Sequence, residues 1–294
     1  MPEKQKVVRE PRPLASSGSG APASDDGSLL AAAGASLAAQ RRKELRTRRT
    51  LQVALLVVLL VSWQLWADLF DTAFWTSSPT DVLEQLFAWS ETGTLWTGLR
   101  ATLTATVVGF VIGASAGAVV GFLLGWMRTL GDVLEPFITA LYTLPKIALA
   151  PLFVLWFGIG VTTKIAIAAL LVFFLVFFTT FRGTREVDPE LVDLARVMGA
   201  GRFATLLKIG MPSAGVWVFS GLKLALPYAL IGAVVGEFIA STEGIGFLIN
   251  NAAALLNTAG VFAGLVVLMI TASGLTALLR LAEKHFLSWQ DASN

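Results

Sequence analysis

Six long runs of apolar residues decide what this chain can fold into. A helix needs ~20 mostly apolar residues to cross a bilayer. In lipid every backbone polar group must be bonded within the protein, so such runs form helices and not open sheets. The sequence therefore predicts an all-α, polytopic membrane helix bundle of about six transmembrane helices. The runs lie near residues 51–67, 99–126, 133–157, 161–181, 213–239 and 259–281.

The composition agrees with a membrane protein and argues against several classes of enzyme. Hydrophobic residues make up 55% of the chain and charged residues 14%, whereas soluble domains carry ~25% charge. The chain has no Cys and one His, His285, so it has no thiol nucleophile and no Cys-rich or His-rich metal centre. It also lacks the G-x-x-x-x-G-K-[S/T] motif that holds ATP phosphates. We expect a chain that is not an enzyme, holds no cofactor or metal, and at a formal charge of +2 binds no nucleic acid.

Charges outside the apolar runs predict the orientation in the membrane. Residues 1–50 carry ten of the 22 Lys and Arg residues among Ser, Gly, Ala and Pro, which is typical of a disordered basic arm. The connection 68–98 is acidic and has no Lys or Arg, whereas 182–212 contains five basic residues. By the positive-inside rule, the arm and 182–212 are cytoplasmic and 68–98 is periplasmic. Six spans then return the tail, 286–294, to the cytoplasm.

The connection 182–212 has the local pattern of a helix, a break and a second amphipathic stretch. Asp188 at an N-cap followed by Pro189 predicts a helix start. Apolar residues then recur at the spacing of one helix face until Gly199 breaks the run. An amphipathic helix on the membrane surface is an alternative explanation of this pattern. The residues on that face are Leu191, Leu194, Ala195 and Met198.

The run from Asp193 to Pro212, DLARVMGAGRFATLLKIGMP, resembles the cytoplasmic signature of bacterial ABC-importer permeases. That signature reads E-A-A, three residues, G, nine residues, I-x-L-P. Asp193 replaces the Glu, Leu194 the first Ala and Met211 the Leu. The resemblance extends over about residues 90–290, and the segments 144–160 and 236–252 look like the nitrate, sulfonate and taurine branch. The residues that match the signature spacing are Asp193, Ala195, Gly199, Ile209 and Pro212.

This resemblance implies a permease subunit of an ATP-binding-cassette importer in a bacterial inner membrane. It implies a type I core of five helices at 99–285, preceded by the span at 51–67. It also implies a second permease copy, a homodimer, P-loop ATPase subunits that hold ATP and Mg, and a periplasmic substrate-binding protein. The loop 182–212 docks on the ATPase in such proteins. The coupling residues implied are Asp193, Ala195, Arg196, Gly199, Arg202, Ile209 and Pro212. We expect Arg196, Arg202 and Lys208 to pair with acids of the ATPase.

The solute that this branch implies is a small anion of the nitrate, sulfonate or taurine type. A vitamin precursor such as hydroxymethylpyrimidine is the alternative within the same branch. Ionisable residues inside apolar runs are costly and are therefore candidates for the pathway. Lys146 lies between Pro145 and Pro151, where an interrupted helix and a cation would make a polar patch for an anion. We expect these three residues and Glu237 to line the translocation pathway.

Structural roles for the same residues are also consistent with the sequence. Lys146 could pair with Glu237 or extend its ammonium to the membrane interface. Lys164 lies at a predicted span end, where interfacial anchoring explains it. Glycines at every fourth position from Gly109 to Gly125 predict close packing of one helix against another.

Two other classes of polytopic membrane protein were weighed against an importer permease. A stand-alone secondary transporter usually contains an internal inverted repeat, but the signature of loop 182–212 occurs once and the two halves differ in charge and length. An intramembrane enzyme needs a Ser/His, paired-Asp or His–metal arrangement, and His285 lies beyond the last apolar run. The importer permease is favoured, with the secondary transporter as the alternative.

Overall fold

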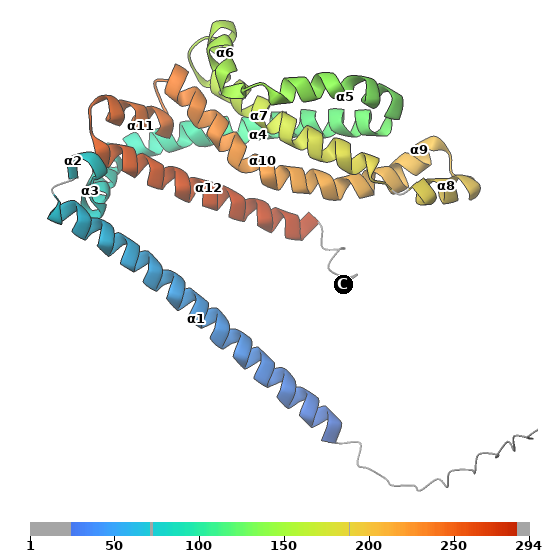
Figure 1. Cartoon of the computed structure of the whole chain (residues 1–294), viewed down its shortest axis with the longest axis horizontal. Helices are drawn as coiled ribbons and strands as arrows, with labels where there is room; N and C mark the ends of the chain where they lie inside the picture. The colour runs from blue at the N-terminus through green and yellow to red at the C-terminus, as the bar shows by residue number, and fades with distance from the viewer. Residues whose placement is uncertain (1–24, 71–72, 188, 287–294) are drawn as a thin grey trace, which may run out of the picture. The chain divides into compact units, whose positions relative to one another are not determined.

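The computed structural model describes residues 25–70, 73–187 and 189–286. The chain divides into two compact units, Met1–Val61 and Ser62–Asn294. The described residues form helices and contain no strand (Figure 1). Among them are five helices long and apolar enough to cross a membrane, or six if one bent pair counts as a single span. The predicted all-α, polytopic membrane bundle is confirmed. The straight candidates are Arg46–Leu69, Thr94–Trp126, Val161–Arg185, Leu206–Ala240 and Thr258–Glu283.

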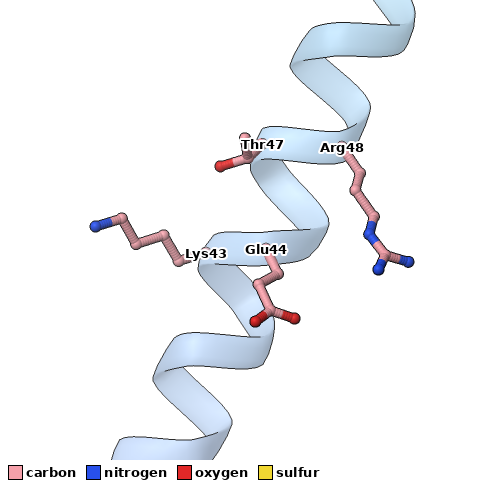
Figure 2. Close-up of a pocket in the computed structure, with 4 residues that line it drawn as sticks. All are labelled: Lys43, Glu44, Thr47 and Arg48. Carbon is pink, nitrogen blue, oxygen red and sulfur yellow. The ribbon is translucent and has the colours of Figure 1, made fainter.

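Helix α1, Asp25–Leu69, includes most of the described part of the first unit. The structure differs here from the predicted disordered arm 1–50, because residues 25–50 are helical, while 1–24 lie outside the described residues. Ala, Leu and Arg are abundant in 25–50 and have high helix propensity. Figure 2 shows four exposed side chains that line a shallow pocket and all come from α1, so a ligand would not be enclosed there. These residues are Lys43, Glu44, Thr47 and Arg48.

Glycines allow the central helices of the second unit to approach closely. Helix α7 packs against both α4 and α10. A Cβ atom on Gly113 would lie 2.3 Å from the carbonyl oxygen of Ala169. One on Gly121 would lie 2.6 Å from the carbonyl oxygen of Phe177. The helix packing predicted from the glycine stripe is therefore confirmed. The three helices are α4 (Thr94–Trp126), α7 (Val161–Arg185) and α10 (Met211–Ala240).

The third apolar run, 133–157, does not form one straight helix. It is split between α5 and a second piece, Lys146–Phe157, and the two pieces are bent by 82°. Pro145 causes the break, because a residue that precedes proline avoids the helical conformation. Leu144 accordingly has φ −61° and ψ 136°. The segments are α5 (Arg128–Thr143), the 3₁₀ turn η1 (Lys146–Leu149) and α6 (Ala150–Phe157).

The fifth span also differs from its prediction, because it begins before residue 213. A π-helical segment, Leu206–Gly210, joins α9 to α10, so the apolar helix runs over Leu206–Ala240. Pro212 lies in the first turn of α10, and proline clashes with the carbonyl four residues before it in a regular α-helix. The wider π turn accommodates this proline. The predicted loop is thus continuous with the span.

Short helices lie at both ends of the second unit (Figure 1). Helices α2, α3 and α11 are at one end, and α8 and α9 are at the other. The predicted connection 68–98 contains α2 and α3; Ser78 caps α3 by accepting a hydrogen bond from the Asp81 N–H at 3.2 Å. The remaining helices are α2 (Ala73–Thr76), α3 (Pro79–Glu91), α8 (Pro189–Val197), α9 (Arg202–Thr205), α11 (Ile245–Ala254) and α12 (Thr258–Phe286).

We predict that Gly113→Ala destabilises the bundle and that Gly274→Ala does not. The Cβ at Gly113 would meet the backbone of α7, whereas nothing lies within 4 Å of a Cβ at Gly274 in α12. Overpacking costs about 1–3 kcal/mol, and alanine in an open helical position is favourable. Thermal unfolding in detergent should give a lower Tm for Gly113→Ala only. Equal Tm values for the two variants would contradict the close α4–α7 contact.

Candidate functional site

Helix α8 and the turn after it have the geometry expected from the sequence. The helix begins at Pro189, as predicted. Gly199 follows its end with φ +84°, a left-handed conformation that favours glycine, and has open space around it. We call the exposed apolar side chains of this segment the α8 face, because they would be buried only by a partner or by lipid. The α8 face consists of Leu191, Leu194, Val197 and Met198.

The other predicted coupling residues lie along the same segment. Asp193 is exposed on α8, and Ala195 is half-buried. Ile209 is half-buried in the π-helical segment, and Pro212 is exposed at the start of α10. Arg196 lies in α8 and Arg202 begins α9, but their side chains lie outside the described part of the structure. Their role in coupling stays a prediction.

Lys146 lies at the break between α5 and α6, where it is bonded within its own segment. Its ammonium donates to the carbonyl oxygen of Tyr142 at 2.6 Å. It also lies 4.1 Å from the centre of the Tyr142 ring and 5.2 Å from that of Phe174. A cation at the last carbonyls of a helix is favourable, and so is a cation over an aromatic face. Pro145 and Pro151 flank this half-buried cation and are exposed.

Glu237 is not close enough to pair with Lys146. Its carboxylate is buried and lies 3.5 Å from the ammonium of Lys164. It also accepts hydrogen bonds from the Thr102 hydroxyl at 2.9 Å and from the Gly246 N–H at 2.8 Å. The Lys146–Glu237 pair considered from the sequence is therefore wrong. The interfacial role considered for Lys164 is also wrong, because Lys164 is 1% exposed.

The sequence analysis missed Lys164 and Thr102 as partners of Glu237. Lys164 carried a usable signal, because a charged residue inside an apolar run is costly unless it is paired. Thr102 carried none, because threonine is common in helices that cross membranes and its partner depends on the fold. Among the described residues, no group of three or more His, Cys, Asp or Glu could hold a metal ion.

Comparison with known protein families gives one match. Residues 109–287 match the family described as binding-protein-dependent transport system inner membrane component. That range covers most of the second unit and includes α8, the π-helical segment, Lys146 and Glu237.

Curated relatives match over most of their length. The chain is 39% identical to the riboflavin transport system permease protein RibX of Chloroflexus aurantiacus, covering 80% of this chain and 88% of RibX. It is 32% identical to the taurine transport system permease protein TauC of Escherichia coli, and the match covers 82% of this chain and 90% of TauC. It is 29% identical to the formylaminopyrimidine transport permease protein ThiX of Halalkalibacterium halodurans, and the match covers 80% of this chain and 93% of ThiX.

Solved structures support the fold alone. A chain of the MetNI methionine ABC transporter aligns with a TM-score of 0.51 at 20% identity, covering 64% of this chain and 92% of that one. A chain of an amino acid ABC transporter, solved together with histidines, aligns with a TM-score of 0.53 at 17% identity. The alignment covers 68% of this chain and 97% of that one. The second unit therefore has the helical fold of importer permeases.

We predict that Lys164→Met destabilises the chain more than the double change Lys164→Met with Glu237→Gln. The single change leaves a buried carboxylate without its cation, which costs about 3–5 kcal/mol. The double change leaves no buried charge. Thermal unfolding in detergent should therefore give a lower Tm for the single variant. A double variant less stable than Lys164→Met would contradict the pairing.

Proposed function

This chain belongs to the family of binding-protein-dependent transport system inner membrane components, and from this membership we propose how it works. It is a multi-pass transmembrane permease subunit of an ABC importer. We propose that two copies form the translocation pathway as a homodimer, because one copy of about six helices encloses little space by itself. The N-terminus, the C-terminus and the α8 end of the bundle face the cytoplasm in this proposal, which follows the distribution of Lys and Arg.

The proposed solute is a small anion of the sulfonate or taurine type, with nitrate in the same charge class. The relative TauC is named for taurine, and another relative, SsuC of Bacillus subtilis, is named for aliphatic sulfonates. Lys146 supports an anion, because it is a half-buried cation beside an interrupted helix. The second candidate is a vitamin or vitamin precursor, since RibX is named for riboflavin and ThiX for formylaminopyrimidine.

The proposed ATPase contact is the α8 face together with Asp193, Arg196 and Arg202. Three exposed apolar side chains on the nine-residue helix α8, together with Met198 directly after it, would leave water when α8 enters a groove on the partner. The observation that carries this proposal is the match of this segment to the family signature. The left-handed turn at Gly199 supports it. ATP and Mg would be held by the ATPase. A periplasmic binding protein would deliver the solute.

Two connections could carry motion from α8 into the membrane. The first is the π-helical segment, which makes α9 continuous with α10. The second is Arg185, the last residue of α7. Its guanidinium lies 2.7 Å from the carboxylate of Asp132 and 3.3 Å from that of Glu135, both in α5. These carboxylates are exposed, so the pairs orient α5 more than they stabilise it.

We predict that Gly199→Leu abolishes coupling and that Gly201→Leu is tolerated. Gly199 has φ +84°, where a side chain is strained, whereas Gly201 lacks a positive φ, and both have open space around them. A P-loop ATPase should co-purify from the native membrane with the unmodified chain and with Gly201→Leu. Capture and ATP-driven uptake should fall at least about tenfold for Gly199→Leu, as loss of one good contact allows. A chain that purifies alone and moves solute in liposomes without ATP would favour a stand-alone secondary transporter.

We predict that Lys146→Met weakens uptake of an anionic solute, whereas Lys43→Met has little effect. Lys146 would neutralise the solute at the helix break, while Lys43 is exposed on α1. The apparent KM for taurine or a sulfonate should rise about tenfold, the effect of losing one partly desolvated charge contact. Riboflavin uptake that is present and unaffected by Lys146→Met, with no taurine uptake by either chain, would favour the vitamin class.

A further inference from the structure

Three buried polar side chains tie the start of α11 to three other helices. They are Thr102 of α4, Lys164 of α7 and Glu237 of α10, and we call them the Glu237 cluster. Besides its pair with Glu237, the ammonium of Lys164 donates to the Glu243 carbonyl at 2.9 Å and to the Ser241 hydroxyl at 3.1 Å. This ammonium therefore makes two hydrogen bonds and one ion pair. The cluster holds both the loop before α11 and α11 itself.

The cluster supplies the cap that α11 lacks. A helix leaves its first N–H groups without partners in its own backbone. The N-cap residue of α11 is Gly244, which has no side chain to accept a hydrogen bond. The Ile245 N–H instead donates to the Thr102 hydroxyl at 2.9 Å, and the Gly246 N–H donates to Glu237. A negative charge at a helix N-terminus is also favourable, so α11 begins where the other helices place these two acceptors.

The space around the cluster is filled by protein. Gly244 has φ +131°, and a Cβ there would lie 2.1 Å from the carboxyl carbon of Glu237. A Cβ on Gly246 would lie 2.9 Å from the Glu237 Cβ, and one on Gly236 would lie 2.9 Å from the Lys164 Cα. With such close packing, the cluster leaves no room for a solute. Its role must be to hold segments in place.

The cluster lies at the far end of α7 and α10 from the α8 end. Helix α10 has 30 residues and carries Glu237 near its C-terminal end, so about 40 Å separate this carboxylate from the π-helical segment at 1.5 Å per residue. Helix α7 carries Lys164 in its first turn and ends at Arg185, just before α8. Two rigid helices therefore connect the α8 end with the cluster.

We propose that Thr102, Lys164 and Glu237 are positioning residues that hold residues 241–254 on the ends of α4, α7 and α10. Displacement of α7 and α10 at the α8 end then moves α11 at the opposite end of the bundle. A buried ion pair fits this role, because it adds little net stability over apolar residues but fixes one arrangement. The holding role stands on geometry alone, whereas transmission from α8 rests on the proposed function.

Apolar packing keeps α11 in the fold when the cluster is altered. Ile245, Leu248 and Ile249 form a buried group with side chains of α3, α4 and α12. Loss of a cluster contact should therefore loosen the start of α11 and leave the bundle folded. This separation makes the proposal testable with a local probe.

The first experiment uses the absence of Cys from the chain. Leu248→Cys is the reporter, since Leu248 is 8% exposed one turn from Gly244, and Val176→Cys is the control in the core, at 0% exposed. Each is placed in the unaltered chain, in a chain with Thr102→Val, and in a chain with the double change Lys164→Met and Glu237→Gln, which leaves no buried charge. Reaction with a water-soluble maleimide is timed in detergent. Thr102→Val keeps both charges, so it serves as the milder variant.

We expect the reporter to react about tenfold faster with the double change, the effect of losing one charge-assisted hydrogen bond. A smaller increase should occur with Thr102→Val, and the rate at the core control should not change. Unchanged reporter rates in both variants would overturn the proposal. An equal increase at the core control would also overturn it, because the cluster would then stabilise the whole fold and not α11.

The second experiment tests transmission in the transporter assembled with its ATPase. Adding ATP should change the reporter rate in the unaltered chain and should not change it with Thr102→Val. The same ATP response in both would overturn transmission through the cluster. If no ATPase assembles with the unaltered chain, the proposed function fails and transmission fails with it. The holding role would still be judged by the first experiment, so the two failures are distinguishable.

Discussion

The close contact between α4 and α7 determines how the rest of the second unit is built. Glycines remove the side chains that would separate the two backbones, and a Cβ at Gly113 or Gly117 would lie within 2.6 Å of a carbonyl oxygen of α7. Helix α10 approaches α7 in the same way, since a Cβ on Gly232 would lie 2.6 Å from the Ala168 Cα. With α7 held on both sides, its two ends have fixed surroundings. One end places Lys164 beside Glu237, and the other places Arg185 beside α5.

Three lysines in the described apolar segments have partners inside the protein. Lys164 pairs with Glu237, Lys223 of α10 pairs with Glu283 of α12, and Lys146 bonds to the last turn of α5. In lipid an unpaired charge is costly, so each partner limits how the helices can be arranged. Lys164 and Glu237 lie near the ends of α7 and α10, and Lys146 lies at the break between α5 and α6, whereas Lys223 lies in the middle of α10. Apolar packing alone would permit more arrangements of the same helices.

Local sequence patterns predicted the helices and their ends well. Contacts between distant segments could not be predicted from the sequence. Span positions, the helix start at Pro189 and the break at Gly199 follow from length, hydropathy and capping rules that act within a few residues. The family signature could also be found, because its spacing is local. The pairing of Lys164 with Glu237 depends on how α7 and α10 pack, and the sequence gives no register for that contact. The size of the bend at Pro145 likewise depends on the helices around it.

Relatives that match most of this chain are named for different solutes. This limits which parts of the structure can select the solute. Relatives named for riboflavin, taurine and formylaminopyrimidine match most of this chain, so the packing of the common helices does not select the solute. The Glu237 cluster is closed by packing. The remaining candidates for solute selection are the break between α5 and α6 and a partner protein. At the break, the ammonium of Lys146 already has a carbonyl and two aromatic rings. An anion must therefore compete with contacts worth about 1–3 kcal/mol together. Recognition at Lys146 then requires the end of α5 to rearrange, which ties solute binding to the part of the bundle that Arg185 connects to α8.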